Sequence, residues 1–201
     1  LIIQLILNCM KEQLMNKANE RFNFIKHKWF DTEDIKNHIK NYDKQWTINT
    51  SRQKNFYPHK NTKTVFIYES DLNWKLNSLY LSTLMSDDKI LVNMLEPIIK
   101  QLEKMHNGQR GQVLLINLEA GKGIADHEDG GDYLLSVRRH HIPIITSPET
   151  KFWVDGESVS MGVGECWEIN NAKTHSVINQ SDVDRIHLLI DIMPNAIVND
   201  K

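Results

Sequence analysis

Three side chains that can bind a metal ion are the strongest functional signal in the sequence. His127 and Asp129 stand two positions apart, and alternate side chains of an extended strand point to the same face. His175 lies in the run 174–177, which has strand character, and supplies a second imidazole. Two histidines and one carboxylate on one face form the arrangement of non-haem Fe(II) oxygenases, which leaves other coordination positions open. We therefore predict that these three residues are catalytic iron ligands.

Cationic residues near these ligands could hold an anionic co-substrate. Arg185 lies in the apolar run 184–191, and a buried arginine there could grip a carboxylate with two parallel hydrogen bonds. In the run 138–141, alternation puts Arg139 and His141 on one face and the other two residues on the opposite face. A buried arginine needs an anion, because an unpaired buried charge is costly. The anion could be a structural aspartate, but we favour a co-substrate for Arg139 and His141.

The His-x-Asp pair alone is a weak signal, because such pairs are common by chance. The later His175 and Arg185 strengthen it, and four nearby glycines allow tight turns close to a ligand: Gly121, Gly123, Gly130 and Gly131. The alternative assignment makes His175 a hydrogen-bonded core residue and Asp129 part of a turn. The charged neighbours Asp126 and Glu128 are expected to face solvent.

The composition narrows the classes of protein and partner. The chain has 201 residues, of which 40% are hydrophobic and 25% charged, and its formal net charge is -2. This charge gives no general attraction to nucleic acid or to an anionic membrane, so neither is expected as a partner. The apolar run at 1–7 is too short to span a bilayer. Cys9 and Cys166 form no CxxC pair, which excludes a zinc ribbon and favours a soluble protein in the reducing cytoplasm.

The pattern of apolar residues predicts helices first and strands second. Before residue 110 it predicts helices at 1–20 and 88–106, a short helix after Asp31 or Thr32, and strands within 21–29 and at 64–69. The irregular segments at 43–63 and 70–87 are the expected lids over a substrate. His59 and Trp74 are candidate substrate contacts within them, although a structural role is favoured for both.

From Gly111 onward, short apolar runs separated by turn residues predict strands at 111–118, 123–127, 133–145, 151–154, 157–160, 165–169, 174–179 and 184–191. Strands at this spacing are typical of a sandwich or barrel. We therefore predict a mainly β fold with N-terminal helices. It is a single domain over 1–201, with a helical elaboration at 1–110 against a jelly roll at about 111–191.

Several motifs in the second half resemble one known family. They are His127-x-Asp129, Arg139-x-His141-Ile-Pro-Ile, Phe152-Trp-Val-Asp-Gly, Gly164-Glu-x-Trp-Glu-Ile-Asn-Asn, His175-Ser-Val-x-Asn and Arg185-Ile-His-Leu-x-Ile-Asp191. As a set they are similar to the aspartyl/asparaginyl β-hydroxylases, a family of 2-oxoglutarate- and Fe(II)-dependent oxygenases. A weaker similarity extends back through Arg52-Gln53 and the run 59–67. The resemblance implies a cupin-like double-stranded β-helix.

The resemblance also implies a reaction and a set of site residues. His127, Asp129 and His175 would hold Fe(II), and Arg185, with Arg139 and His141, would bind 2-oxoglutarate. Some members lack the acidic ligand, but Asp129 is present here. The implied reaction uses O2, converts 2-oxoglutarate to succinate and CO2, and hydroxylates an unactivated C–H bond. The expected substrate is an Asp/Asn-type side chain in a peptide or protein, or a free amino acid.

Two alternatives remain at the level of sequence. One is a cupin-like metalloenzyme that does not use 2-oxoglutarate, and the other is a non-catalytic jelly-roll binding module. Arg185 discriminates against the first, because such an enzyme needs no carboxylate clamp. The intact triad argues against the second. The oligomeric state is left open.

Overall fold

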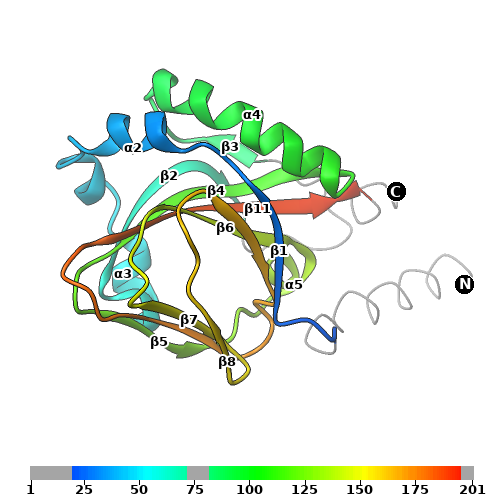
Figure 1. Ribbon diagram of the computed structural model, residues 1–201. Coiled ribbons are helices and arrows are strands. Elements are labelled where there is room, and N and C mark those ends of the chain that lie inside the picture. Colours follow the sequence, from blue (N-terminus) through cyan, green and yellow to red (C-terminus); the bar gives the residue numbers. More distant parts are fainter. Residues whose placement is uncertain (1–19, 72–81, 196–201) are drawn as a thin grey trace, which may run out of the picture.

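The computed structural model of the protein describes residues 20–71 and 82–195. Cys9, Trp74 and most of the helix expected at 1–20 lie outside the described residues. The described chain forms two antiparallel sheets that face each other, with helices outside the larger one (Figure 1). This confirms the predicted mainly β jelly roll. Within the described ranges, every helix is too short or too polar to traverse a lipid bilayer.

The larger sheet contains seven strands. Its order, from one edge to the other, is β1 (Phe24–Trp29), β9 (Glu165–Ile169), β6 (Arg138–Ile145), β11 (Arg185–Pro194), β4 (Gly108–Leu118), β2 (Thr62–Ser70) and β3 (Ser82–Leu84). Three of these strands precede residue 110, so the sheet is not confined to 111–191 as expected. They extend both edges of the sheet and cover backbone groups that would otherwise be unpaired.

The smaller sheet contains four strands and closes the other side of the jelly roll. Its order is β5 (Gly123–His127), β10 (His175–Asn179), β7 (Thr150–Val154) and β8 (Glu157–Val159). The bounds of β5 and β9 agree with the sequence prediction, and those of β7, β8 and β10 differ by one residue.

Strand β11 shows how alternation builds a site inside this fold. One face of the strand is apolar and packs in the core beneath the helices, through Ile186, Leu188, Ile190 and Ile192. The opposite face points into the jelly roll and carries Arg185, His187, Leu189 and Asp191. Because side chains alternate along a strand, every polar residue on the inner face is matched by an apolar neighbour outside. The strand therefore anchors the core and supplies the site at the same time.

Two helices cover the outer face of the seven-stranded sheet (Figure 1). Helix α4 (Lys89–Met105) agrees with the segment predicted at 88–106, and α2 (Glu33–Ile39) packs beside it. Asp88 caps α4, because its carboxylate accepts a hydrogen bond from the Leu91 amide at 2.9 Å. The apolar stripe of α4 is buried through Leu91, Leu95, Ile98, Ile99 and Leu102.

Short helices occupy the remaining connections. The segment at 43–63, expected to be an irregular lid, folds into η2 (Gln45–Thr47), α3 (Ser51–Asn55) and η3 (Tyr57–His59). The strand expected at 133–145 is wrong over its first part, where α5 (Asp132–Ser136) precedes β6. Tyr133 is buried on α5, and its hydroxyl bonds to Asp191 at 3.0 Å, which ties the helix to the sheet. This tertiary contact outweighs the strand-like run of apolar residues.

Candidate metal and co-substrate site

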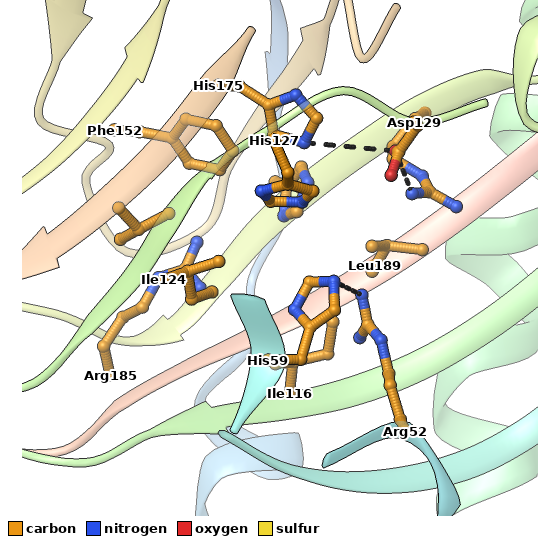
Figure 2. Close-up of a pocket in the computed structure, with 13 residues that line it drawn as sticks. Arg52, His59, Ile116, Ile124, His127, Asp129, Phe152, His175, Arg185 and Leu189 are labelled. Carbon is orange, nitrogen blue, oxygen red and sulfur yellow. Dashed lines mark hydrogen bonds and ion pairs between the residues drawn. The ribbon is translucent and has the colours of Figure 1, made fainter. Parts of the chain in front are cut away.

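The three predicted metal ligands meet at one end of the jelly roll. His127 on β5 stands directly opposite His175 on β10, and the centroids of the two rings are 4.2 Å apart (Figure 2). Asp129 Oδ2 lies 4.0 Å from His175 Nε2. The ligand atoms of all three residues lie within 4.8 Å of one another. The structure thus brings together residues that are far apart in sequence.

Both histidines are held with the same ring nitrogen facing inward. His127 Nδ1 lies 2.8 Å from the Ala125 carbonyl, and His175 Nδ1 lies 2.9 Å from the Lys173 carbonyl. A carbonyl accepts but cannot donate, so each Nδ1 carries the proton and each Nε2 keeps a lone pair. Histidine ligands of metals are usually oriented by such a hydrogen bond. The donor set therefore fits a divalent metal such as Fe(II).

Asp129 lies just past the end of β5 and is held from both sides. Its amide donates to the Asn171 carbonyl at 3.0 Å, and its Oδ2 accepts from Asn171 Nδ2 at 3.1 Å and from Arg139 Nη1 at 2.5 Å. Burial raises the pKa of this carboxyl, but the combined charges of Arg139 and the other cationic neighbours outweigh burial and hold the pKa well below its usual range. The neighbouring Asp126 and Glu128 are exposed, as expected.

Arg139 forms ion pairs with two carboxylates of the protein itself. Its Nε and Nη2 donate to the two oxygens of buried Asp191 at 2.9 and 2.8 Å, and its Nη1 donates to Asp129. Burial alone would lower its pKa, but these carboxylates raise the pKa above the usual value. At least part of the anion that the sequence analysis required is therefore a structural aspartate. A contact between Arg139 and a co-substrate stays a prediction.

Arg185, unlike Arg139, has no ion-pair partner in the described chain. Its side chain is buried, Nη2 donates to His187 Nδ1 at 2.7 Å, and the guanidinium lies 5.7 Å from the centroid of the Phe152 ring. Within the described chain, its Nε has no hydrogen-bond partner and no carboxylate forms an ion pair with it. Burial and the charge of Arg52 lower its pKa to about 9. A buried cation without a counter-ion is costly, which suits a site that receives an anion.

His141, the remaining predicted site residue, lines the same cavity as Arg139 and Arg185. It is buried, its ring centroid is 5.1 Å from that of Phe152, and its Nδ1 has no partner among the described atoms. Burial and the charges of Arg185 and Arg139 lower its pKa well below the usual value, so the ring is neutral. A neutral imidazole with an unused nitrogen can form a hydrogen bond to a bound molecule.

All six predicted site residues line one cavity. Apolar side chains complete the wall and limit the access of water: Ile116, Ile124, Phe152, Val177 and Leu189 (Figure 2). The cavity therefore joins a metal donor set to a buried cation within a largely apolar enclosure. This combination fits Fe(II) together with an organic anion.

Two further residues line the cavity; Arg52 was not assigned to the site from sequence, and His59 was only a candidate substrate contact for which a structural role was favoured. Arg52 on α3 and His59 on η3 come from the segment at 43–63, and Arg52 Nη2 donates to His59 Nε2 at 3.2 Å. Arg52 Nη1 is buried without a partner in the described chain, and burial lowers the pKa of the guanidinium to about 10. The motif similarity at Arg52 and His59 was the available signal, but the helical turns that aim them inward were not predictable from an irregular segment.

The fold and the site define a jelly-roll protein in which two histidines and one carboxylate lie close enough together to hold a metal ion. The sequence profile described as Aspartyl/Asparaginyl beta-hydroxylase matches residues 30–194, so the chain belongs to that family. It is therefore an enzyme of the 2-oxoglutarate- and Fe(II)-dependent hydroxylases, which favours the enzyme over both alternatives raised by the sequence. No curated protein matches the chain.

One solved structure supports the fold, and a second is reported for its similarity alone. The viral collagen prolyl hydroxylase of Paramecium bursaria Chlorella virus-1, solved with 2-oxoglutarate, is 8% identical, with a TM-score of 0.53 over 87% of this chain and 97% of that one. A 2-oxoglutarate/Fe(II) oxygenase-family oxidoreductase from Burkholderia pseudomallei is 11% identical, with a TM-score of 0.49 over 66% and 67% of the two chains. At these identities the viral enzyme indicates a shared architecture and no more.

Proposed function

We propose that this enzyme hydroxylates an unactivated C–H bond of an Asp/Asn-type side chain, in a peptide or protein or in the free amino acid. His127, Asp129 and His175 hold the iron, and Arg185 binds the far carboxylate of 2-oxoglutarate. The observation that carries this proposal is the buried guanidinium of Arg185, which lacks a described counter-ion and lines the same cavity as the triad. Burying such a charge is unfavourable unless an anion joins it.

Each residue then has a distinct task. When bound, Fe(II) and 2-oxoglutarate supply the oxidising power that inserts one oxygen atom of O2 into a C–H bond, with release of succinate and CO2. The two histidines present Nε2, and Asp129 is fixed by Arg139 and Asn171. Arg185 orients the co-substrate by a charge-assisted hydrogen bond, and His141 offers a neutral ring beside it. The apolar wall excludes water.

The position of Arg52 supports the proposal that the substrate bears a carboxylate. It lines the cavity beside the triad, and its Nη1 has no partner in the described chain. The charge of Arg139 is already matched by Asp191 and Asp129, so Arg52 is the better candidate for an additional anion. The side chain of aspartate, or the α-carboxylate of a free amino acid, has the required charge. His59 positions Arg52 through their hydrogen bond.

The proposal predicts that Arg185→Gln impairs binding of 2-oxoglutarate. Truncating one partner of a buried charge pair costs about 2 kcal/mol or more, so the affinity should fall at least about thirtyfold. The affinity for the metal should change little. Calorimetric titration of 2-oxoglutarate without O2, with Mn²⁺ in place of iron, measures the effect.

Arg110→Gln is the matched control. Arg110 is an ion-paired arginine on the outer side of the sheet, bound to Glu96 and Glu103, and it does not line the cavity. This variant should bind 2-oxoglutarate like the wild type. Unchanged affinity in a folded Arg185→Gln protein would overturn the assignment of the clamp.

A further inference from the structure

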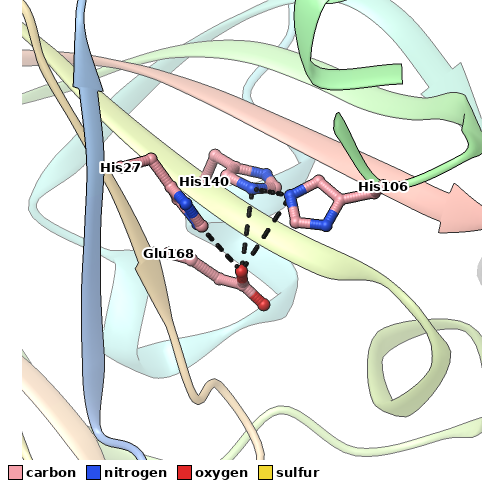
Figure 3. A group of neighbouring side chains, drawn as sticks. All are labelled: His27, His106, His140 and Glu168. Atoms are coloured by element: carbon pink, nitrogen blue, oxygen red, sulfur yellow. Dashed lines mark hydrogen bonds and ion pairs between the residues drawn. The ribbon is translucent and has the colours of Figure 1, made fainter. Parts of the chain in front are cut away.

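A second group of ligand-type side chains lies on the outer face of the seven-stranded sheet. It consists of His27 from β1, His106 at the C-terminus of α4, His140 from β6 and Glu168 from β9 (Figure 3). One ligand atom from each residue lies within 4.8 Å of all the others. We call these four residues the outer cluster. None of them lines the cavity described above.

Alternation along β6 separates the outer cluster from the catalytic cavity. His141 points inward and lines the cavity, so its neighbour His140 points to the opposite face of the sheet. His140 stands directly opposite Glu168 in the pairing of β6 with β9. The pairing of β1 with β9 shifts register between Lys26 and Trp29, around His27. Such irregularities commonly re-aim a side chain next to a functional site.

The distances within the outer cluster suit a tetrahedral ion. His106 Nε2 lies 2.8 Å from His140 Nε2, and His27 Nε2 lies 3.0 Å from Glu168 Oε2. The same carboxylate oxygen lies 4.0 Å from His106 Nε2 and 3.9 Å from His140 Nε2. Metal–ligand bonds of about 2.0–2.1 Å give a tetrahedron with an edge of about 3.3 Å. The observed separations fall on both sides of that value.

Hydrogen bonds already orient two of the ligands. His140 Nδ1 lies 3.2 Å from the Ile190 carbonyl and must donate to it, so Nε2 keeps a lone pair that faces His106. This is the usual support of a metal-bound histidine. Glu168 Oε1 accepts from Arg138 Nη1 at 3.2 Å, which leaves Oε2 to face the three imidazoles. His140 and Glu168 are almost fully buried, whereas the side chains of His27 and His106 are 17% and 14% exposed.

We propose that the outer cluster is a structural Zn²⁺ site, separate from the catalytic iron. Imidazole is a borderline ligand that suits zinc, zinc also binds carboxylate oxygens, and four protein ligands are typical of a structural site without an open position. The site stands at the C-terminus of α4, where the helix dipole favours a cation. The bound ion would tie the edge strand β1 and the end of α4 to the central strands β6 and β9.

Metal counting tests this site independently of the catalytic proposal. Protein freed of metal by chelation is equilibrated with Zn²⁺ and analysed by mass spectrometry for metal per chain. A His127→Gln/His175→Gln variant removes the inner imidazoles, and it should still bind one zinc ion. Adding His106→Gln or His27→Gln to that variant should remove this ion. Both positions are partly exposed, so each replacement can be accommodated without cavity formation, and circular dichroism of the metal-free proteins checks the fold.

His38→Gln is the matched control. His38 is also partly exposed and also pairs with a carboxylate, Asp88, at 2.7 Å, but it belongs to neither group of ligands. In the His127→Gln/His175→Gln background it should leave one zinc ion bound. Zinc should also raise the Tm of that background and should lose this effect when His106 is replaced.

The opposite result would identify the outer cluster as a network of hydrogen-bonded histidines around a buried glutamate. That result is either no zinc in the His127→Gln/His175→Gln variant, or zinc that remains after both His27 and His106 are replaced. A failure of catalysis would not affect this test, because it needs neither 2-oxoglutarate nor turnover.

Discussion

At the residue scale, the arginines of the cavity differ mainly in what neutralises them. Arg139 is paired with Asp191 and Asp129, whereas Arg185 has no described carboxylate partner. The sequence could predict that both point inward, because each occupies an alternate position of a strand. It could not predict which arginine is already paired with an anion. Asp191 lies on a different strand, β11, and Asp129 lies beyond the end of β5.

Arg52 provides a prediction at this scale. If its Nη1, which has no partner among the described residues, binds a substrate carboxylate, Arg52→Gln should raise the KM for the substrate at least about tenfold, because a charged hydrogen bond is lost. The slow turnover of 2-oxoglutarate without substrate should change little. Lys54→Gln is the control, because Lys54 is an exposed cation on the same helix. An unchanged KM in a folded Arg52→Gln enzyme would assign Arg52 a purely structural role.

At the element scale, local sequence patterns predicted the strands well. They did not predict the short helices that carry Tyr133 and Arg52. The predicted bounds of β5 and β9 agree with the structure to the residue, because turn residues bound each of these short strands. The same rule misassigned α5, where Tyr133 is held by a contact with Asp191 on another strand. It also gave no account of α3, whose inward-facing Arg52 depends on how 43–63 folds over the cavity.

Gly164 provides a prediction for the turn before β9. Its φ is +77°, and a Cβ atom at this position would collide with the carbonyl oxygen of Phe30 and the indole of Trp29. Gly164→Ala should therefore lower the free energy of unfolding by at least about 2 kcal/mol more than the backbone strain alone. Urea denaturation measures this loss.

Gly121→Ala separates backbone strain from the collision. Gly121 has a similar φ of +68°, and no atom of the described chain lies within 4 Å of an added Cβ. This variant should lose only about 1–2 kcal/mol, the cost of a left-handed conformation for alanine. Equal losses in the two variants would contradict the close approach of β1 to the Gly164 turn.

At the scale of the whole molecule, one sheet serves two purposes. Its inner face helps to form the cavity of the proposed active site, and its outer face packs against α2 and α4 and carries the outer cluster (Figures 1 and 3). Family motifs in the sequence pointed to the inner face. The outer cluster could not be predicted, because His27, His106 and Glu168 meet only when β1 and the end of α4 dock on the sheet.

The most direct test of the central claim is succinate formation from 2-oxoglutarate, measured with Fe(II) and O2 in the wild type and in His175→Ala. We expect iron-dependent succinate from the wild type. His175→Ala should reduce it at least about a hundredfold, because removing a ligand costs more than removing the group that orients one. Its circular dichroism spectrum should stay that of a folded protein. Turnover that survives in folded His175→Ala would contradict the assignment of the iron site.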